Sequence, residues 1–224
     1  MKLKKKIIIQ GKLTLLSGLH IGDSKENVEI GGVDSPIIRR KNNNQPYIPG
    51  SSLKGKIRSL LEVAMGANAD TSFKKYSATS IIIAQLFGWF GNENHTGNPS
   101  RILVRDAILT AESADLLERS EFTDMPYSEV KFENVIDRLT GTAKNGGIRQ
   151  IERVPAGAEF DIEFVINVME DSDETAFISL LKSGIALLEH DYLGGSGTRG
   201  YGQVSIKLFE PIHKTAEEYL NQTT

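Results

Sequence analysis

The chain has 224 residues, of which 39% are hydrophobic and 25% are charged, a balance that is typical of soluble globular proteins and excludes wholesale disorder. It contains no cysteine, which excludes disulfides, thiolate nucleophiles and cysteine-ligated zinc, and fits a reducing compartment. Its apolar stretches are too short to cross a bilayer or to form a signal peptide behind the basic N-terminus, so we expect a cytoplasmic protein with no membrane partner.

Charge is distributed unevenly along the chain. The net charge is −3, but residues 1–60 carry a net charge of +8 and the remaining residues carry −11. Such asymmetry predicts a site for a polyanion in the N-terminal third. The alternative is a basic segment that only keeps the protein in solution.

The first quarter of the chain predicts a strand, a long insertion and a helix. Residues 6–17 are rich in β-forming side chains and predict a strand. Residues 18–50 are rich in glycine, proline and asparagine, and such a long connection is usually functional or disordered. Residues 51–66 repeat apolar side chains at helical spacing, and either Ser51 or Ser52 is expected to cap that helix.

The remaining elements repeat the same order. After an ambiguous stretch over 73–90, the patterns predict a strand over 101–109, a strand pair around 129–137 and 148–154, a strand over 159–168, a helix over 173–190 and a last strand over 203–210. Strand–helix–strand repeated twice is the pattern of a ferredoxin-like sheet. We therefore expect an α+β fold in one domain, residues 1–224, with long insertions at 18–50 and 112–156.

The helix over 51–66 carries the first candidate site. Three cations stand in its first two turns, where the helix dipole disfavours positive charge unless an external anion is bound there: Lys54, Lys56 and Arg58. The preceding Gly50, with Ser51 and Ser52, supplies backbone N–H groups at the same end. This pattern predicts a phosphate site. The alternative is a core helix flanked by solvated lysines.

A glycine-rich segment near the C-terminus is the second candidate site. Gly195, Gly197 and Gly200 match a dinucleotide-binding pattern, but they follow a helix and precede a strand, which is the wrong order for that motif. We expect instead a backbone nest that approaches a phosphate or a base closely, with Arg199 as its charge. A tight turn that needs several positive φ angles is the alternative.

Asp34 is the candidate catalytic and metal-binding residue. It follows Gly31 and Gly32 inside the basic part of the chain, where a carboxylate can hold hydrated Mg²⁺ against a phosphate. An Asx-turn before Pro36 explains the same residues equally well.

Three further groups each have more than one reading. His20 can act as a general base, contact a phosphate or simply pack. The aromatic cluster of Phe87, Trp89 and Phe90 can stack bases, although a place in the core suits it better. Three arginines in the second insertion either form ion pairs on a hairpin or contact a phosphate: Arg138, Arg149 and Arg153.

Several of these segments together resemble the CRISPR RAMP superfamily. The resemblance rests on GGVDSPIIR at 31–39, YIPGSSLKGKIRS at 47–59 and the terminal glycine-rich loop. Two more segments, VIDRLTGTA at 135–143 and RQIERVP at 149–155, narrow it to the repeated backbone subunit of the type III-A (Csm) interference complex.

This resemblance implies a modified ferredoxin-like fold, similar to RNA-recognition domains, that stacks with other copies of itself and with other Csm subunits along a CRISPR guide RNA. The two insertions would be a lid and a thumb, the thumb kinking the guide–target duplex. Asp34 would cut target RNA at each kink with Mg²⁺ or another divalent metal. Lys54, Lys56, Arg58 and His20 match guide-binding positions. Because cysteine is absent, no zinc site is expected.

Three other functions stay open at this point. In a scaffold that only binds RNA, Asp34 would be a turn residue. In a guide-processing nuclease of the same superfamily, His20 would be the base and cleavage would tolerate chelators. Outside nucleic acids, the basic helix would serve an enzyme acting on a small phosphorylated molecule.

Overall fold

The computed structural model describes residues 2–22, 33–67, 80–89, 97–144, 147–170 and 173–221. Gly31, Gly32 and Phe90, which the sequence singled out, lie outside these residues. No helix in the described ranges is both long and apolar enough to span a bilayer.

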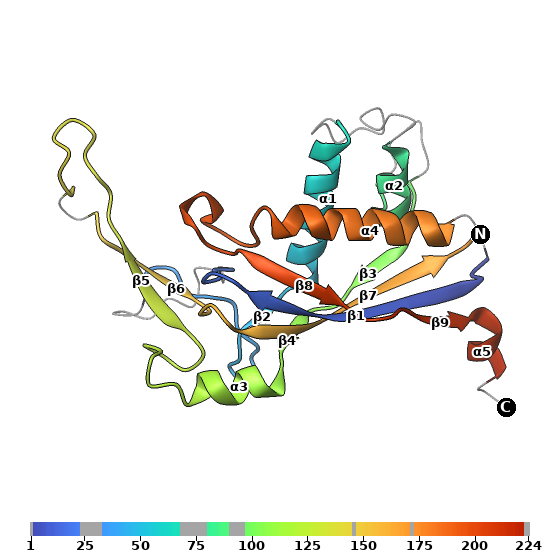
Figure 1. Ribbon diagram of the computed structural model, residues 1–224, viewed down its shortest axis with the longest axis horizontal. Helices are drawn as coiled ribbons and strands as arrows, with labels where there is room; N and C mark the ends of the chain where they lie inside the picture. Colours follow the sequence, from blue (N-terminus) through green and yellow to red (C-terminus); the bar gives the residue numbers. More distant parts are fainter. Residues whose placement is uncertain are drawn as a thin grey trace.

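The described residues form a mixed α+β fold, as expected (Figure 1). The strands are β1 (Lys5–Leu15), β2 (Tyr47–Ile48), β3 (Ile102–Val104), β4 (Ala107–Leu109), β5 (Glu129–Glu133), β6 (Arg149–Arg153), β7 (Glu159–Val168), β8 (Val204–Leu208) and β9 (Ile212–Thr215). The helices are α1 (Gly50–Ala64), α2 (Ile81–Phe87), α3 (Ala111–Glu118), α4 (Asp173–Glu189), the short 3₁₀-helix η3 (Gly197–Arg199) and α5 (Ala216–Asn221).

The main sheet has the strand order of a ferredoxin-like fold. Its strands run β2-β4-β7-β1-β8, while β3 also pairs with β7 and β9 with β1, and each of these pairs is antiparallel. The long strand β1 therefore lies between β7 and β8, and α1 and α4 cover the same face of the sheet (Figure 1). This arrangement is the split β-α-β pattern that the sequence predicts.

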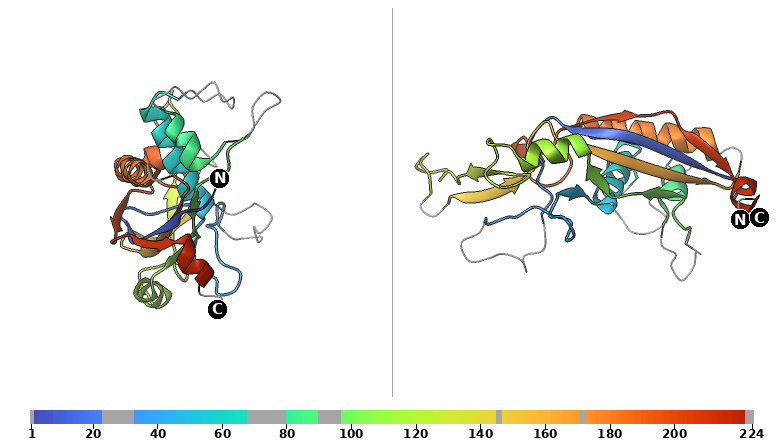
Figure 2. Two further views of the ribbon diagram at one scale, coloured as in Figure 1. Left: turned by 90° about the vertical axis from the view of Figure 1, so that its right-hand side faces the viewer. Right: turned by 90° about the horizontal axis from the view of Figure 1, so that it is seen from below.

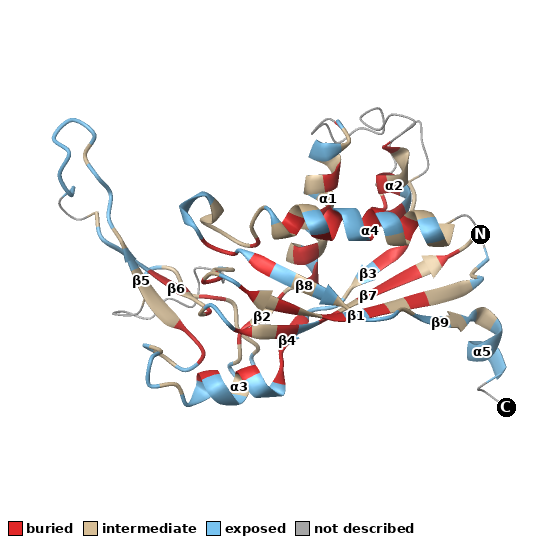
Figure 3. Ribbon diagram, viewed as in Figure 1, coloured by how far each residue is buried: buried red, intermediate tan, exposed pale blue. Residues whose placement is uncertain are grey.

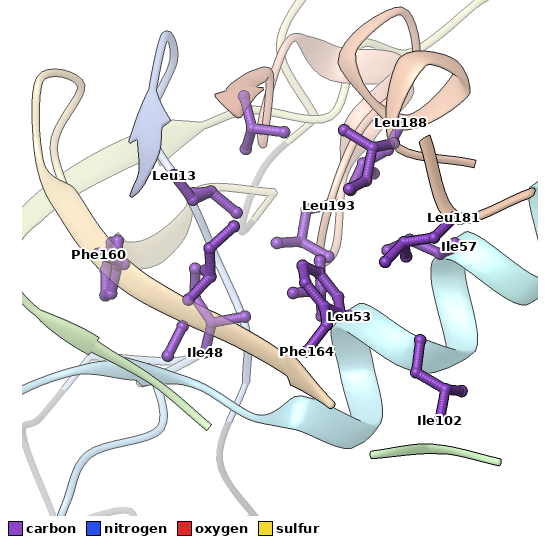
Figure 4. Packing of buried hydrophobic residues seen from close by; sticks show 14 of the residues in the cluster. Leu13, Ile48, Leu53, Ile57, Ile102, Phe160, Phe164, Leu181, Leu188 and Leu193 are labelled. Atoms are coloured by element: carbon purple, nitrogen blue, oxygen red, sulfur yellow. The ribbon is translucent and has the colours of Figure 1, made fainter. Parts of the chain in front are cut away.

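The core lies between that face and the two helices. From Ile7 to Leu15 the odd-numbered residues of β1 are buried, as the alternation predicts. They pair in register with β7, for example Leu13 with Phe160, and the buried stretches of both strands are red in Figure 3. Leu53 and Ile57 of α1 face the same cluster (Figure 4). A Cβ on Gly184 of α4 would lie 2.6 Å from Ile57 Cγ2, so the close approach of the two helices requires glycine there.

The opposite face of the sheet is polar along its central strands. Gln10 and Lys12 of β1 point to this face and hydrogen-bond across to Glu163 (3.0 Å) and Glu159 (3.3 Å) of β7. RNA-recognition domains present aromatic side chains on their open sheet face to stack bases. Because β1 and β7 carry polar and charged pairs there instead, this face does not suit base stacking of that kind.

Two local expectations at the start of α1 and in the strand over 101–109 are wrong. Pro49 is the N-cap of α1, with φ −57°, and neither serine makes a capping hydrogen bond. The strand is split into β3 and β4 because Arg105 and Asp106 interrupt it. Asp106 Oδ1 accepts a hydrogen bond from Gly50 N at 2.8 Å. The Asp106 side chain therefore fixes the start of α1.

Several short elements were not predicted, among them β2, α3, β9 and α5. A signal for α3 was present, because the Thr110 side chain caps it by accepting from Ser113 N at 3.2 Å. Strand β9 adds to the edge of β1, with Ile8 opposite Ile212. Figure 2 shows α3 on the other side of the sheet from α4.

The strands β5 and β6 form a separate two-stranded sheet that projects from the body (Figure 2, right). Glu129 pairs with Arg153 at its base and Glu133 with Arg149 farther out. The described residues beyond this pair, 134–144 and 147–148, continue the projection away from the end of the molecule where β1 begins (Figure 1). We call β5, β6 and residues 134–148 the hairpin.

Candidate nucleic-acid interface

The strand β6 fixes the position of Asp34. Asp34 Oδ2 accepts a hydrogen bond from Gln150 N at 2.8 Å, and the next residue, Ser35, accepts one from Glu152 N at 3.1 Å. The segment that carries Asp34 thus runs beside β6 as a short parallel bridge. The carboxylate is exposed at the base of the hairpin rather than buried in the core.

Glu152 is the buried anchor of this segment. Its side chain is enclosed, and its carboxylate accepts hydrogen bonds from Ile37 N (2.8 Å), Ser128 Oγ (2.6 Å) and Arg39 Nη2 (2.6 Å). A buried carboxylate is tolerated when its charge is paired and its oxygens are hydrogen-bonded. Glu152 therefore ties the Asp34 segment, the base of β5 and β6 together.

His20 is held by two backbone contacts, one to β6 and one to the glycine-rich loop. Its Nδ1 lies 2.7 Å from Glu152 O, and because a carbonyl only accepts, Nδ1 carries the hydrogen. In the neutral ring this leaves Nε2 as an acceptor. The His20 carbonyl accepts from Gly195 N at 2.8 Å. Asp34, His20 and the glycine-rich loop thus come together around β6.

Steric reasons explain most of the glycines in the loop over 194–202. Gly194 has φ +75°, and a Cβ there would lie 2.4 Å from His20 O. A Cβ on Gly197 would overlap the ring of Tyr192. At Gly200 the space is open although φ is +84°. The turn interpretation, which needs positive φ angles, accounts for Gly194 and Gly200, and the contact with the Tyr192 ring accounts for Gly197.

A basic cavity of about 520 Å³ lies between the hairpin and the glycine-rich loop. It brings three of the predicted arginines together, along with one lysine that the sequence analysis missed: Arg138, Arg149, Arg199 and Lys131. Because Arg149 directly precedes Gln150, whose N–H holds Asp34, the cavity begins beside the candidate catalytic carboxylate.

Arg153 does not line this cavity. Its Nε lies 2.5 Å from Glu129 Oε1, and its guanidinium is 5.1 Å from the centre of the Tyr201 ring. Its side chain also lies against Gly18, where an added Cβ would approach within 2.5 Å. Of the two readings of this arginine, the structure shows the ion pair on the hairpin.

Tyr201 and Glu133 join the loop to the hairpin. The Tyr201 hydroxyl donates to Glu133 Oε1 at 2.8 Å, and Arg199 Nη1 lies 3.4 Å from Glu133 Oε2. Burial, and then the hydrogen bond to Glu133, raise the pKa of Tyr201 to about 12. Burial alone would raise the pKa of Glu133, but the Tyr201 hydrogen bond and the charges of Lys131 and Arg199 lower it overall.

The three cations of α1 do not share one site. Lys56 Nζ lies 2.9 Å from Asp191 Oδ2 and 3.6 Å from the centre of the Tyr192 ring, next to the glycine-rich loop. Lys54 and Arg58 point instead to a separate groove, which Ser51 also lines. Ser52 follows it in the first turn, where its N–H donates to Pro49 O at 2.9 Å.

The donors near Asp34 suit an ion that substrate helps to bind. Among the described residues there is no group of three or more histidine, aspartate and glutamate side chains placed to hold a metal. Glu152 is committed to Arg39. Mg²⁺ is commonly bound by one or two carboxylates together with substrate phosphates and water. Asp34 fits that kind of site and not a preformed cage.

Lys131, Glu133, Glu152 and Tyr201 are the site residues that sequence reasoning missed. Lys131 and Glu133 share one face of β5 by strand alternation, which a firmer strand boundary would have revealed. Tyr201 directly follows the glycine-rich loop, but nothing in the sequence shows that Glu133, distant along the chain, is its partner.

Comparison with known proteins gives consistent matches over nearly the whole chain. The family model of the RAMP superfamily matches residues 12–205. The "CRISPR system Cms endoribonuclease Csm3" of Methanocaldococcus jannaschii is 42% identical over 97% of this chain and 85% of that protein. The protein of the same name from Enterococcus italicus is 41% identical, over 91% of this chain and 90% of that protein.

Two solved structures are similar in fold. A crystal structure of a Csm3-Csm4 subcomplex in the type III-A CRISPR-Cas interference complex matches with a TM-score of 0.61 and 31% identity, over 98% of this chain and 85% of that chain. Methanopyrus kandleri Csm3 matches with a TM-score of 0.68 and 22% identity, over the full chain and 81% of that chain, a likeness in fold alone.

Proposed function

The chain belongs to the RAMP superfamily, and from that premise we propose that it is the guide-binding backbone subunit of a type III-A CRISPR effector complex. In that role it assembles with further copies of itself and with other Csm subunits along a guide RNA. It is also an endoribonuclease that cuts the target RNA paired to the guide at regular intervals. The naming of its relatives as Csm3 endoribonucleases supports this activity.

One observation carries the proposal: an exposed carboxylate stands next to a cavity lined by cations. Asp34 is held by the backbone of Gln150, and the adjacent Arg149 lines the basic cavity with Arg138 and Arg199. Cations of this kind position an RNA backbone without reading its sequence. The nearby Asp34 carboxylate supports a role in chemistry on a phosphate of that backbone.

The arrangement suits a cleavage reaction in which the RNA supplies its own nucleophile. When the backbone is bent so that a 2′-hydroxyl stands in line with the adjacent phosphate, the hydroxyl attacks and the 5′-oxygen leaves. The protein contributes by holding that geometry and by stabilising charge with its cations. Asp34 orients the attack. A divalent ion held by Asp34 would supply further stabilisation of negative charge on the phosphate.

The test is the Asp34→Asn variant in the assembled complex with guide RNA. We expect target cleavage to fall by at least about a hundredfold, the usual scale for losing a positioned group, while guide binding and assembly stay unchanged. Asp161→Asn is the matched control, because Asp161 is an exposed aspartate on the polar sheet face, away from the cavity. Wild-type cleavage by Asp34→Asn would contradict the assignment and favour a scaffold that only binds RNA.

Metal dependence is tested separately with a chelator. If a divalent ion takes part, EDTA stops cleavage by the wild-type complex and added Mg²⁺ restores it. Cleavage that persists in EDTA would overturn the metal role.

Guide processing by His20 is the second candidate function. It is favoured by the fixed tautomer of His20, whose Nε2 is left as an acceptor while Nδ1 donates to Glu152 O. For this function we expect chelator-resistant cleavage of guide precursor that His20→Ala abolishes and Asp34→Asn leaves intact.

A further inference from the structure

A second cavity, separate from the basic cavity at the hairpin, lies between the start of α1 and the end of α2. It has a volume of about 550 Å³. Cationic side chains of α1 line one side and aromatic side chains line the other: Lys54, Arg58, Phe87 and Trp89, with Ser51 and Ser100 between them. We call it the α1–α2 groove.

Positive charge in this groove is not balanced at Lys54. Its Nζ donates to Ser100 Oγ at 2.7 Å and to Ile102 O at 3.4 Å, both neutral acceptors. Within the described residues no carboxylate pairs with it, whereas Arg58 pairs with Glu62 at 2.8 Å. Burial, and then the charge of Arg58, lower the pKa of Lys54. An anion in the groove would relieve that penalty.

The aromatic side of the groove is held firmly. Phe87 is buried, and Trp89 is half-buried and packs on the core. Two backbone hydrogen bonds, of 2.9 and 3.0 Å, pair Trp89 with Asn98. Gly88 between the aromatic residues has φ +80°, and a Cβ there would lie 2.7 Å from Ser100 N. These contacts fix the backbone that carries the indole of Trp89.

We propose that the α1–α2 groove binds one nucleotide of single-stranded RNA, with its base against Trp89 and its phosphate at Lys54 and Arg58. An aromatic surface beside cations is how proteins bind single strands without sequence preference. The cavity has the size of a small-ligand site. The inference rests on the proposed RNA-binding function, and it adds a base-contacting residue to a site previously argued from charge alone.

The chain provides a direct reporter, because Trp89 is its only tryptophan. The full chain is titrated with an end-labelled single-stranded oligoribonucleotide and with an oligomer of equal length that lacks bases. Anisotropy of the label reports binding, and tryptophan fluorescence reports the groove. We expect the normal RNA to quench the fluorescence, and the abasic oligomer to bind about tenfold more weakly with little quenching.

Variants test the same contacts. Trp89→Phe keeps an aromatic ring and should bind RNA nearly as well as wild type, whereas Trp89→Leu should lose about tenfold in affinity. The double variant Lys54→Ala, Arg58→Ala should lose both affinity and quenching. The matched control is Lys12→Ala, a lysine on the polar sheet face paired with Glu159, which should behave as wild type.

The outcomes distinguish a failure of the groove proposal from a failure of the proposed RNA-binding function. If anisotropy shows RNA binding while Trp89 fluorescence does not change, the groove proposal is overturned and the proposed function stands. If the oligoribonucleotide does not bind at all, both fall. Thermal melts identify variants that fail to fold, and in that case the wild-type comparison of normal and abasic RNA decides.

Discussion

Glu152 shows how one buried residue helps to determine where two candidate residues lie. Its carboxylate holds the Asp34 segment through Ile37 N, and its backbone carbonyl orients His20. Neither contact touches the reacting atoms, so Glu152 is a positioning residue. Removing one partner of a buried ion pair typically costs about 3–5 kcal/mol, which makes Arg39 and Glu152 dependent on each other.

Tyr201 makes the stability of the loop–hairpin contact dependent on pH. Its pKa is raised from 10.0 to about 12 in the folded protein, so folding favours the protonated hydroxyl. The stabilisation is complete below about pH 10 and is lost as pH rises through about 12. At neutral pH the hydrogen bond to the charged Glu133 contributes about 1–3 kcal/mol.

We therefore predict that Tyr201→Phe lowers the free energy of unfolding at neutral pH, and that its difference from wild type shrinks at alkaline pH. Urea unfolding of both proteins at about pH 8 and about pH 11 measures this. The matched control is Tyr47→Phe, a tyrosine at the edge strand β2. A difference between wild type and Tyr201→Phe that is independent of pH would contradict the role of the hydroxyl.

At the scale of elements, the hairpin divides into a structural base and an outer part. Tyr127 and Ser128, just before β5, are buried, and Ser128 Oγ donates to Glu152. Beyond the Glu133–Arg149 pair, the described residues are mostly exposed, and Leu139 is 97% exposed. A deletion of the whole span 121–147 would also remove β5 and the Ser128 contact with Glu152, so the outer part is the better target.

We predict that replacing residues 134–148 with Asn-Gly leaves the body folded. A two-residue turn of this kind closes an antiparallel pair such as β5 and β6. The melting temperature should stay within a few degrees of wild type. In the assembled complex, target RNA should no longer be cut at regular intervals, because the element proposed to kink the duplex is gone.

The cleavage products are resolved on a sequencing gel. Leu139→Ser is the control that keeps the hairpin and changes one exposed side chain. A ladder with wild-type spacing from the shortened protein would show that the outer hairpin does not set the cut sites.

The main elements were predictable because their patterns are long. The alternation in β1 and β7 and the apolar stripe of α1 each continue over ten or more residues, so local sequence determines them. The short elements β9 and α5 lack that length. The split between β3 and β4 depends on a contact of Asp106 with Gly50, which lies far away in sequence.

The candidate site was predictable in its residue types and less so in its arrangement. Charge density pointed to α1, yet it could not show that Lys56 turns toward Asp191 while Lys54 enters another groove. Trp89 was assigned mainly to the core, and the structure shows that it also lines that groove. Such outcomes depend on tertiary neighbours, which local periodicity does not encode.

At the scale of the whole molecule, the presence of two separate basic sites implies that one copy of the chain contacts several nucleotides of the RNA. The basic cavity and the α1–α2 groove share no residue. The exposed apolar side chains of the hairpin, such as Phe132 and Leu139, suit contact with a neighbouring copy or with bases.

We predict that longer single-stranded RNA binds more copies of the chain, with a stepwise increase in complex mass, because neighbouring copies share one backbone. Mass photometry across a series of RNA lengths measures it. Binding should weaken steeply with salt, by about 0.7 log units per phosphate contact for each tenfold rise in salt. One copy per RNA at every length would contradict assembly along the strand.

The place of β1 in the sheet has a consequence for synthesis on the ribosome. Among the described strands, β1 pairs with β7, β8 and β9, which are made last. Because pairing across such sequence separation is slow, β1 waits unpaired while most of the chain is translated. His20 and the glycine-rich loop meet only after residue 195 has emerged. A chain that ends before residue 195 therefore lacks the contact between His20 and the glycine-rich loop.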